Sequence, residues 1–108
     1  MELAIQIVRF VDDAQPGVVA AEFVDAVGRR HTLIGSVPMF SEARLNAASA
    51  YPQPGAARCE ILLRRLDAQK REIVRISTLR PDAIESTEGL SEFEVLSPQL
   101  SPRKVSKS

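Results

Sequence analysis

Short stretches in which apolar and polar residues alternate run along most of the chain, and Gly or Pro residues close them. The segment from Leu3 to Ile7 alternates in this way, and Pro16 and Gly17 follow it. A period of two predicts β-strands with one buried face. Six strands are expected, at residues 2–11, 18–25, 30–37, 57–66, 71–78 and 91–96.

The first three expected strands are joined by short turns, which predicts an antiparallel meander. The first turn contains Asp12, Pro16 and Gly17, three residue types that favour tight reversals of the chain. Gly28 is expected to adopt the left-handed conformation in the second turn. Pro38 lacks a backbone N–H group and is expected to end the third strand.

Residues 39–56 lack a clear alternation. Ser41 is a suitable cap for a single helical turn over residues 41–45. Residues 51–55 contain two prolines, which exclude a helix and a central strand. We therefore expect this region to be a long connection across the end of the sheet.

The most regular alternation lies in residues 57–66. Four residues are expected to face the core there, namely Ala57, Cys59, Ile61 and Leu63. Three are expected to face solvent, namely Arg58, Glu60 and Arg64. Leu, Arg and Glu would also suit a helix, but the spacing of two and the β-branched residues that follow favour a strand.

The last two expected strands complete the fold. Residues 67–70 are expected to turn the chain into the fifth strand, whose inward residues are Val74, Ile76 and Thr78. A long loop follows over residues 79–90. Phe93 and Val95 are expected to point inward from the short final strand.

These features predict one all-β domain over residues 1–96. Six short strands without a substantial helix leave exposed edges unless the sheet curls. The expected fold is therefore a small six-stranded antiparallel barrel or half-open barrel, built from the meander and a hairpin. Residues 97–108 are rich in Ser and Pro and contain Arg103, Lys104 and Lys107, so a flexible basic tail is expected there.

Composition narrows the function classes. The chain has 108 residues, of which 44% are hydrophobic and 5% aromatic, so the core must be mainly aliphatic. Fourteen basic and fourteen acidic residues give a net charge of zero, which suggests no nucleic acid and gives little protection against self-association. The start of the sequence does not resemble a signal peptide, and no apolar run approaches the roughly 20 residues that span a membrane. A cytoplasmic location is expected.

His31 is the single histidine of the chain, and Cys59 is its single cysteine. His31 is expected to be a partly exposed strand residue beyond a hairpin. Cys59 is the single cysteine, which excludes an intramolecular disulfide and a multi-cysteine metal site. Its inward position predicts a buried, unreactive thiol. A pair of His31 and Cys59 would need hydrogen-bond reach between them. No catalytic residue, metal or cofactor is predicted.

Acidic residues gather near the end of the chain. Five of them fall within thirteen residues that contain no basic residue, and they are Asp82, Glu85, Glu88, Glu92 and Glu94. Their spacing does not match a calcium-binding loop. The pattern indicates a solvated acidic loop, or an acidic surface that binds a partner.

Basic residues gather instead on the expected hairpin, at Arg64, Arg65, Lys70, Arg71 and Arg75. Nucleic-acid-binding barrels interleave such residues with exposed aromatics, and the hairpin has none. Cross-strand ion pairs with the final strand would account for both clusters without a ligand. The candidate binding residues are Arg64, Arg65, Arg71, Arg75, Glu85 and Glu88.

Four stretches made mainly of turn residues resemble small uncharacterised bacterial single-domain proteins. They are residues 8–13 with 15–17, residues 25–29 with His31, residues 51–55 with Cys59, and residues 85–89 with Phe93. The resemblance spans most of residues 8–96. It implies a compact β-domain, and it implies no catalytic residues.

We therefore expect a non-catalytic cytoplasmic β-domain that binds another protein. Its size suits a regulatory or immunity-like partner of a larger protein, by analogy, and strand addition at an open sheet edge is a suitable mode. The first alternative is a nucleic-acid-binding barrel that uses Arg64, Arg65, Arg71 and Arg75. The second alternative is an enzyme centred on His31.

Overall fold

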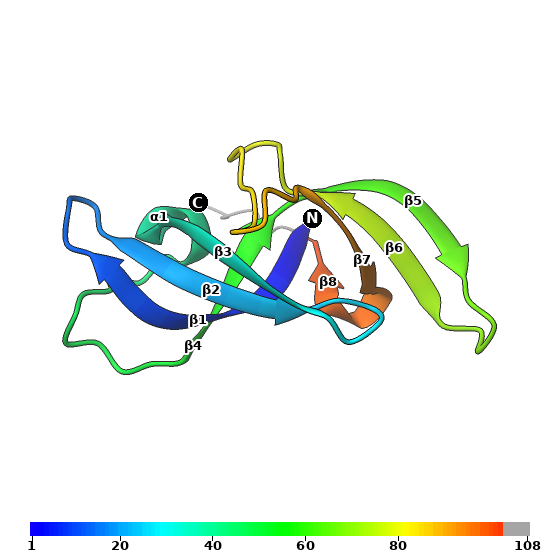
Figure 1. The fold of residues 1–108 in the computed structure, drawn as a ribbon, viewed down its shortest axis with the longest axis horizontal. Helices are drawn as coiled ribbons and strands as arrows, with labels where there is room; N and C mark the ends of the chain where they lie inside the picture. Colours follow the sequence, from blue (N-terminus) through cyan, green and yellow to red (C-terminus); the bar gives the residue numbers. More distant parts are fainter. Residues whose placement is uncertain (103–108) are drawn as a thin grey trace, which may run out of the picture.

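The computed structural model describes residues 1–102, and it confirms the expected all-β fold (Figure 1). Eight strands occur in that range and form two hydrogen-bonded antiparallel sheets, one of five strands and one of three. The strands are β1 (Glu2–Asp12), β2 (Val18–Val24), β3 (Arg30–Ser36), β4 (Gln53–Arg58), β5 (Glu60–Leu66), β6 (Glu72–Ser77), β7 (Glu92–Leu96) and β8 (Leu100–Ser101). Two short helical turns, α1 (Val37–Phe40) and η1 (Ser97–Gln99), complete the set.

The five-stranded sheet contains the expected meander. Its strand order is β3-β2-β1-β4, the short fifth strand β8 also pairs with β1, and all neighbouring pairs are antiparallel. Gly28 adopts a φ of 87° in the turn between β2 and β3, as expected. The register of β1 against β2 shifts twice between Ile7 and Asp12. These irregularities explain why the alternation of apolar residues is less regular at that end of β1.

The three-stranded sheet has the order β5-β6-β7. The expected turn at residues 67–70 joins β5 to β6, and Asp67 Oδ1 accepts hydrogen bonds from the N–H groups of Gln69 and Arg71. The backbone bond from Arg71 is the main cause that lowers the pKa of Asp67. Phe93 and Val95 are buried on β7, as expected. The residues of this turn therefore predicted the β5–β6 hairpin correctly.

The connection expected over residues 39–56 ends earlier than expected, so its last residues were assigned wrongly. Strand β4 begins at Gln53, and Pro54 pairs with Gln6 of β1. Because β4 is the outer strand of its sheet, the missing N–H group of Pro54 is tolerated there. A Cβ atom at Gly55 would lie 2.7 Å from the carbonyl oxygen of Phe40, so this position requires glycine.

The expected strand over residues 57–66 is divided at Cys59. Residues before Cys59 belong to the first sheet and residues after it belong to the second. The Cys59 N–H group donates to the carbonyl of Met1 at 2.9 Å, which fixes the crossing point. The pairing with β6 also skips a residue between Ile61 and Leu63. Leu63 is consequently exposed, and its expected inward position was wrong.

Two further expectations are corrected in the connecting segments. The helical turn lies at α1, four residues before the expected turn at 41–45, and it contains Pro38 in its first turn. Residues 97–101, expected as part of a flexible tail, form η1 and β8. Leu100 pairs with Leu3, and the side-chain amide of Gln99 donates to the carbonyl of Val24 at 2.7 Å. The basic residues Arg103, Lys104 and Lys107 lie outside the described residues.

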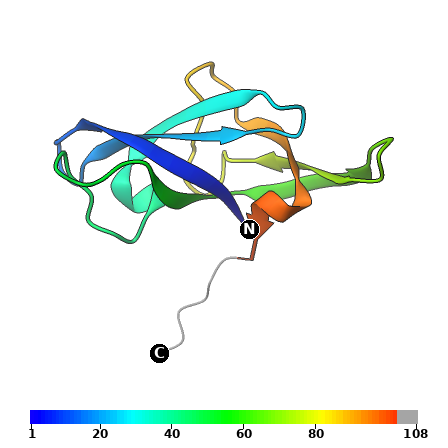
Figure 2. The same cartoon turned by 90° about the horizontal axis from the view of Figure 1, so that it is seen from below.

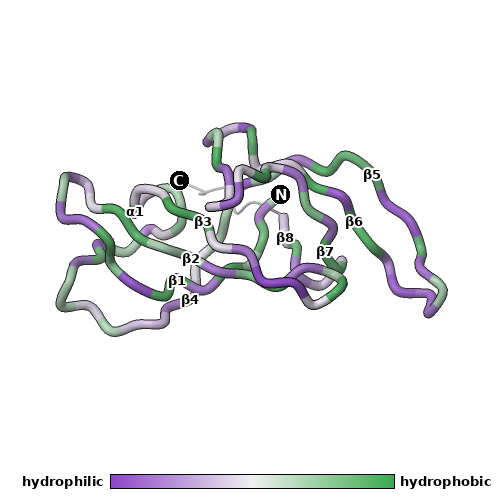
Figure 3. Tube along the Cα trace, viewed as in Figure 1, coloured by the Kyte–Doolittle hydropathy of each residue, from purple (hydrophilic) through white to green (hydrophobic). Residues whose placement is uncertain are grey.

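The two sheets share one hydrophobic core. It combines residues of the first sheet (Leu3, Ile5, Ile7, Val19, Ala21, Phe23 and Leu33) with residues of the second (Val74, Ile76, Phe93 and Val95). Val37, Phe40, Leu45 and Ile84 extend it from the connecting segments. Figure 3 shows that apolar positions also continue along β5, away from this core.

The space between β3 and β7 is spanned by a loop. Ser86 forms a bridge with Leu33, and the Thr87 N–H group donates to the carbonyl of Thr32 at 2.9 Å. The Ala26 N–H group donates to the carbonyl of Glu94 at 2.8 Å.

Within residues 1–102 no strand pairing closes the two sheets into a barrel. The hairpin of β5 and β6 extends away from the body in both views (Figures 1 and 2). The described chain contains no helix of the length and hydropathy needed to cross a membrane.

Candidate functional site

The second sheet joins its basic and acidic residues in ion pairs. Arg65 of β5 reaches across β6 to Glu94 of β7, with Nη2 to Oε1 at 3.1 Å and Nε to Oε2 at 3.3 Å. The hydrogen bond to Glu94 raises the pKa of Arg65. Arg75 of β6 contacts Glu92 of β7 at 3.0 Å. The interpretation of the charge clusters as cross-strand ion pairs is therefore confirmed for these residues.

The other two candidate arginines are paired as well. Arg64 contacts Glu72 at 3.1 Å, and Arg71 contacts Asp67 at 2.8 Å. All four pairs are partly exposed to solvent, so each adds little to stability. Their main effect is local: each carboxylate neutralises and orients a guanidinium group that would otherwise attract phosphate.

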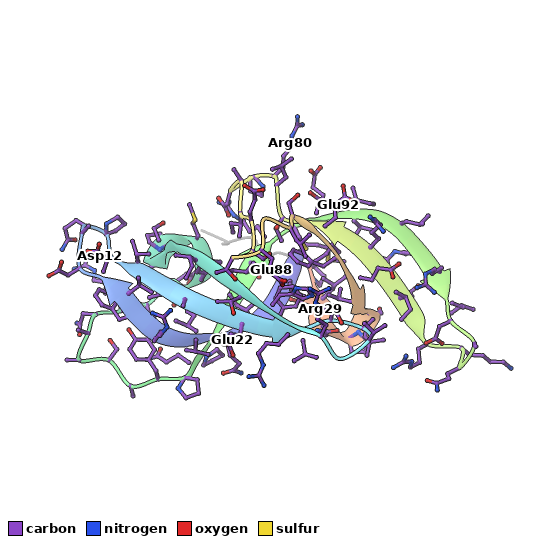
Figure 4. All side chains as sticks on the ribbon, in the orientation of Figure 1. Asp12, Glu22, Arg29, Arg80, Glu88 and Glu92 are labelled. Atoms are coloured by element: carbon purple, nitrogen blue, oxygen red, sulfur yellow. The ribbon has the colours of Figure 1, made fainter. Side chains whose placement is uncertain are left out.

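The acidic candidates do not join the arginines of the hairpin. Glu88 contacts Arg29, in the turn between β2 and β3, at 3.0 Å (Figure 4). Glu85 is exposed and has no ion-pair partner within the described residues. Asp82 binds the guanidinium group of Arg58, with Arg58 Nε to Asp82 Oδ2 at 2.9 Å. The acidic side chains of this loop therefore make separate contacts and do not form one binding patch.

His31 is buried, so its expected partial exposure was wrong. The residue is 4% exposed, and its ring packs against the rings of Phe23 and Phe93 at centroid distances of 5.2 and 4.8 Å. Nε2 lies 2.8 Å from Oδ2 of Asp25. Burial raises the pKa of Asp25, but the bonds from His31 and from two backbone N–H groups outweigh it and lower the pKa. Position 31 is buried because Phe93 of β7 packs against its ring.

An Asp–His pair can orient a general base. A cavity of about 200 Å³ adjoins it, and no Ser, Thr or Cys occurs among the described residues that line this cavity. Nδ1 of His31 is buried without a hydrogen-bond partner in the part of the chain described. Burial raises the pKa of Cys59, which keeps its thiol protonated and unreactive.

A wider hollow of about 710 Å³ lies between the β1–β2 turn and the segment after α1. Its apolar walls include Phe10, Val37 and Leu45, and side chains of both charge signs, such as Asp13 and Arg44, also line it. No cluster of three or more metal-binding side chains occurs in residues 1–102. The mixture of charges in this hollow favours no single class of ligand.

The outer edge of β5 is the least covered apolar surface of a strand. Leu62, Leu63 and Leu66 are 48%, 58% and 69% exposed. Strand β5 pairs only with β6 among the described strands, so its other edge is free. Arg64 and Arg65 are each paired with a carboxylate of β6 or β7. These pairs neutralise two of the charges that would otherwise protect an exposed strand from pairing.

The other sheet edges are better protected. Pro54 interrupts the hydrogen-bonding edge of β4, and residues 86 and 87 cover part of β3.

The sequence did not predict the exposed surface of β5, because Leu63 was expected to lie in the core. The available signal was the adjacent pair of Leu62 and Leu63, which breaks the alternation where the structure has its register shift. No family model, curated protein or solved structure matches the chain.

Proposed function

We propose that the chain is a non-catalytic protein-interaction module whose β5 edge receives an extended strand from a protein partner. The observation that carries this proposal is the exposure of Leu62, Leu63 and Leu66 on a strand with a free edge. Such an edge offers backbone donors and acceptors for strand addition, while exposed side chains select the partner. The strand that fits has apolar side chains opposite the leucines and a carboxylate opposite Arg65.

Burial of leucines supplies the driving force for this contact. Fully burying one leucine side chain stabilises a contact by about 1.5–3 kcal/mol in general. The leucines of β5 retain about half or more of their surface in the isolated chain, so much of this free energy is available on binding. The backbone of β5 is already extended and paired with β6, which reduces the ordering cost of binding.

The alternatives receive less support from the same contacts. Each of the arginines proposed for nucleic-acid binding has a carboxylate partner, and the five aromatic side chains lie off β5 and β6. The cavity that adjoins the Asp25–His31 pair has no Ser, Thr or Cys among the described residues that line it. The proposal also places the protein in the cytoplasm, because its single cysteine is buried and free. A regulatory or immunity-like role for such a module rests on analogy of size.

A synthetic peptide tests this proposal. The probe is an extended peptide of alternating Val or Leu and Glu, titrated into isotope-labelled protein while backbone amide resonances are followed. We expect shifts confined to β5 and its neighbour β6. Leu63→Lys should abolish them, since it places a charge at the centre of the edge.

The matched control is Val27→Lys, which changes an even more exposed apolar residue in the turn between β2 and β3. It should leave the titration unchanged. Peptide binding that shifts amides elsewhere, or that persists in Leu63→Lys, would contradict the proposal. Both positions are on the surface, so neither variant should change stability by more than about 0.5 kcal/mol.

A further inference from the structure

We infer that the strand received by β5 is β5 of a second copy, paired antiparallel about a two-fold axis. This inference rests on the proposed function of the β5 edge and names its partner. A two-fold contact is self-complementary: if residue i of one copy contacts residue j of the other, then j contacts i. Strand β5 must therefore match its own reverse in both side-chain face and charge.

The faces of β5 follow from its pairing with β6. Glu60 lies opposite Ser77, and Arg65 lies opposite Ile73. Ser77 and Ile73 are an even number of residues apart on β6, so they occupy one face of the sheet, and their partners share it. In a regular strand, residues 60 and 65 would point to opposite faces. The register shift near Leu62 brings them onto the same face.

The same reasoning places Ile61 and Arg64 together on the other face. They lie opposite Ile76 and Val74 of β6, which are again two residues apart. Both pairs of β5 residues, 60 with 65 and 61 with 64, have the same midpoint, between residues 62 and 63. A two-fold axis at this midpoint therefore opposes residues that share a face.

Charge complementarity selects this register. It places Glu60 of each copy opposite Arg65 of the other, and it brings the exposed Leu62 and Leu63 of the two copies together at the axis. Registers that centre the axis on Arg64 or Arg65 oppose two like charges, which destabilises a strand pair. The register at the midpoint of 62 and 63 gives two opposite-charge pairs and a central apolar contact.

The side chains are available for these contacts. Glu60 is exposed and has no ion-pair partner among residues 1–102. Arg65 binds Glu94 through Nε and Nη2, and its guanidinium group has further N–H donors for a second carboxylate. The zero net charge of the chain adds no long-range repulsion between copies.

A charge-swap experiment on the full chain tests this inference. Sedimentation velocity over low to high micromolar concentrations should show the wild-type chain changing from monomer to dimer. Glu60→Arg and Arg65→Glu should each weaken dimerisation by about tenfold or more, because each replaces two attractive pairs with two repulsive ones. An equimolar mixture of the two variants should recover wild-type dimerisation, since both pairs in the mixed dimer are again attractive.

The control is Glu42→Arg, which reverses an exposed carboxylate in the loop after α1. It should dimerise as the wild type does. Recovery in the mixture also excludes misfolding as the cause of the single-variant effects. A dimer that is insensitive to Glu60→Arg, or a mixture that stays monomeric, would overturn the inference.

The inference and the proposed function can fail separately. A wild-type chain that remains monomeric throughout, but whose β5 amides still shift with the Val/Leu–Glu peptide, overturns only the identity of the partner. A monomeric chain that also fails to bind the peptide overturns both. A dimer whose β5 amides are unprotected from solvent exchange places the contact elsewhere and likewise overturns the inference.

Discussion

Strands β2 and β5 are both seven residues long, yet their side chains have opposite environments. Val19, Ala20 and Ala21 of β2 are completely buried, whereas every residue of β5 is at least partly exposed. Strand β2 lies between two neighbours in the five-stranded sheet, and β5 is an outer strand of the smaller sheet. In this protein the strands on either side of an apolar residue determine whether that residue is buried. The hydropathy of its own strand predicts burial poorly.

The comparison separates two uses of leucine in one chain. Leucines of the five-stranded sheet, such as Leu3 and Leu33, are completely buried in the common core. Leucines of β5 stay on the surface, where they contribute little to folding and remain available for contact with another strand. The first sheet is therefore expected to dominate stability, and the hairpin of β5 and β6 to dominate association.

The largest expected effect comes from the same substitution made in each sheet. Leu33→Ala should lower the free energy of unfolding by about 3 kcal/mol, because it leaves a cavity in the core. Leu66→Ala should change it by less than about 0.5 kcal/mol, because this side chain is mostly exposed. Urea denaturation with an unchanged m-value measures both. Equal losses for the two variants would contradict the comparison.

The next effect concerns the close packing of β4. Gly55→Ala should cost about 1–3 kcal/mol, because the added methyl group would overlap the carbonyl of Phe40 and the side chain of Ile7. Gly28→Ala is the control. It has a positive φ but no atom within 4 Å of the added carbon, so it should cost about 1–2 kcal/mol from backbone strain alone. A neutral Gly55→Ala would show that β4 can move away from α1.

A smaller effect tests the bond between Asp25, in the turn between β2 and β3, and His31 of β3. Asp25→Ala should cost about 1–2 kcal/mol at pH 7, because it leaves His31 buried without its partner. The pKa of Asp25 is lowered in the fold, so its contribution is present above the ordinary value of 3.8 and is lost as the pH falls through the lower folded value.

The stability difference between the wild type and Asp25→Ala should therefore narrow when the pH falls from 7 to 3. Parallel urea titrations at the two pH values measure it. Asp13→Ala, in the exposed turn between β1 and β2, serves as the control and should show a much smaller difference at both values. A difference that widens toward pH 3 would contradict the assigned role of the Asp25 carboxylate.

Local chemistry was sufficient to predict most of the strands. The meander, the turn at residues 67–70 and the inward positions of Phe93 and Val95 all follow from alternation and turn residues close in sequence. The division at Cys59 was missed because it depends on a distant strand: Met1 accepts the Cys59 N–H group, and β1 pairs only with the residues before it. Pro54 was misread because its place at a sheet edge is a property of the whole sheet.

The contacts of the candidate site residues were predicted only in part. The pairing of Arg65 and Arg75 with the acids of β7 follows from the order of the strands and was anticipated. The burial of His31 was missed, since it requires Phe23 and Phe93 to meet around the ring. The exposure of Leu63 was missed because one skipped residue reverses the face of every later side chain in a strand.

The continuous chain from β4 through Cys59 to β5 also determines where the fold opens first. Because this segment belongs to both sheets, separating the sheets as units would strain a backbone that they share. Opening should start instead at the turn at residues 67–70, which only the β5–β6 pairing holds in place, and proceed toward Cys59. Amide hydrogen exchange should therefore slow gradually along β5 from Leu66 to Glu60, so the proposed binding edge is also the part of the protein that frays most readily.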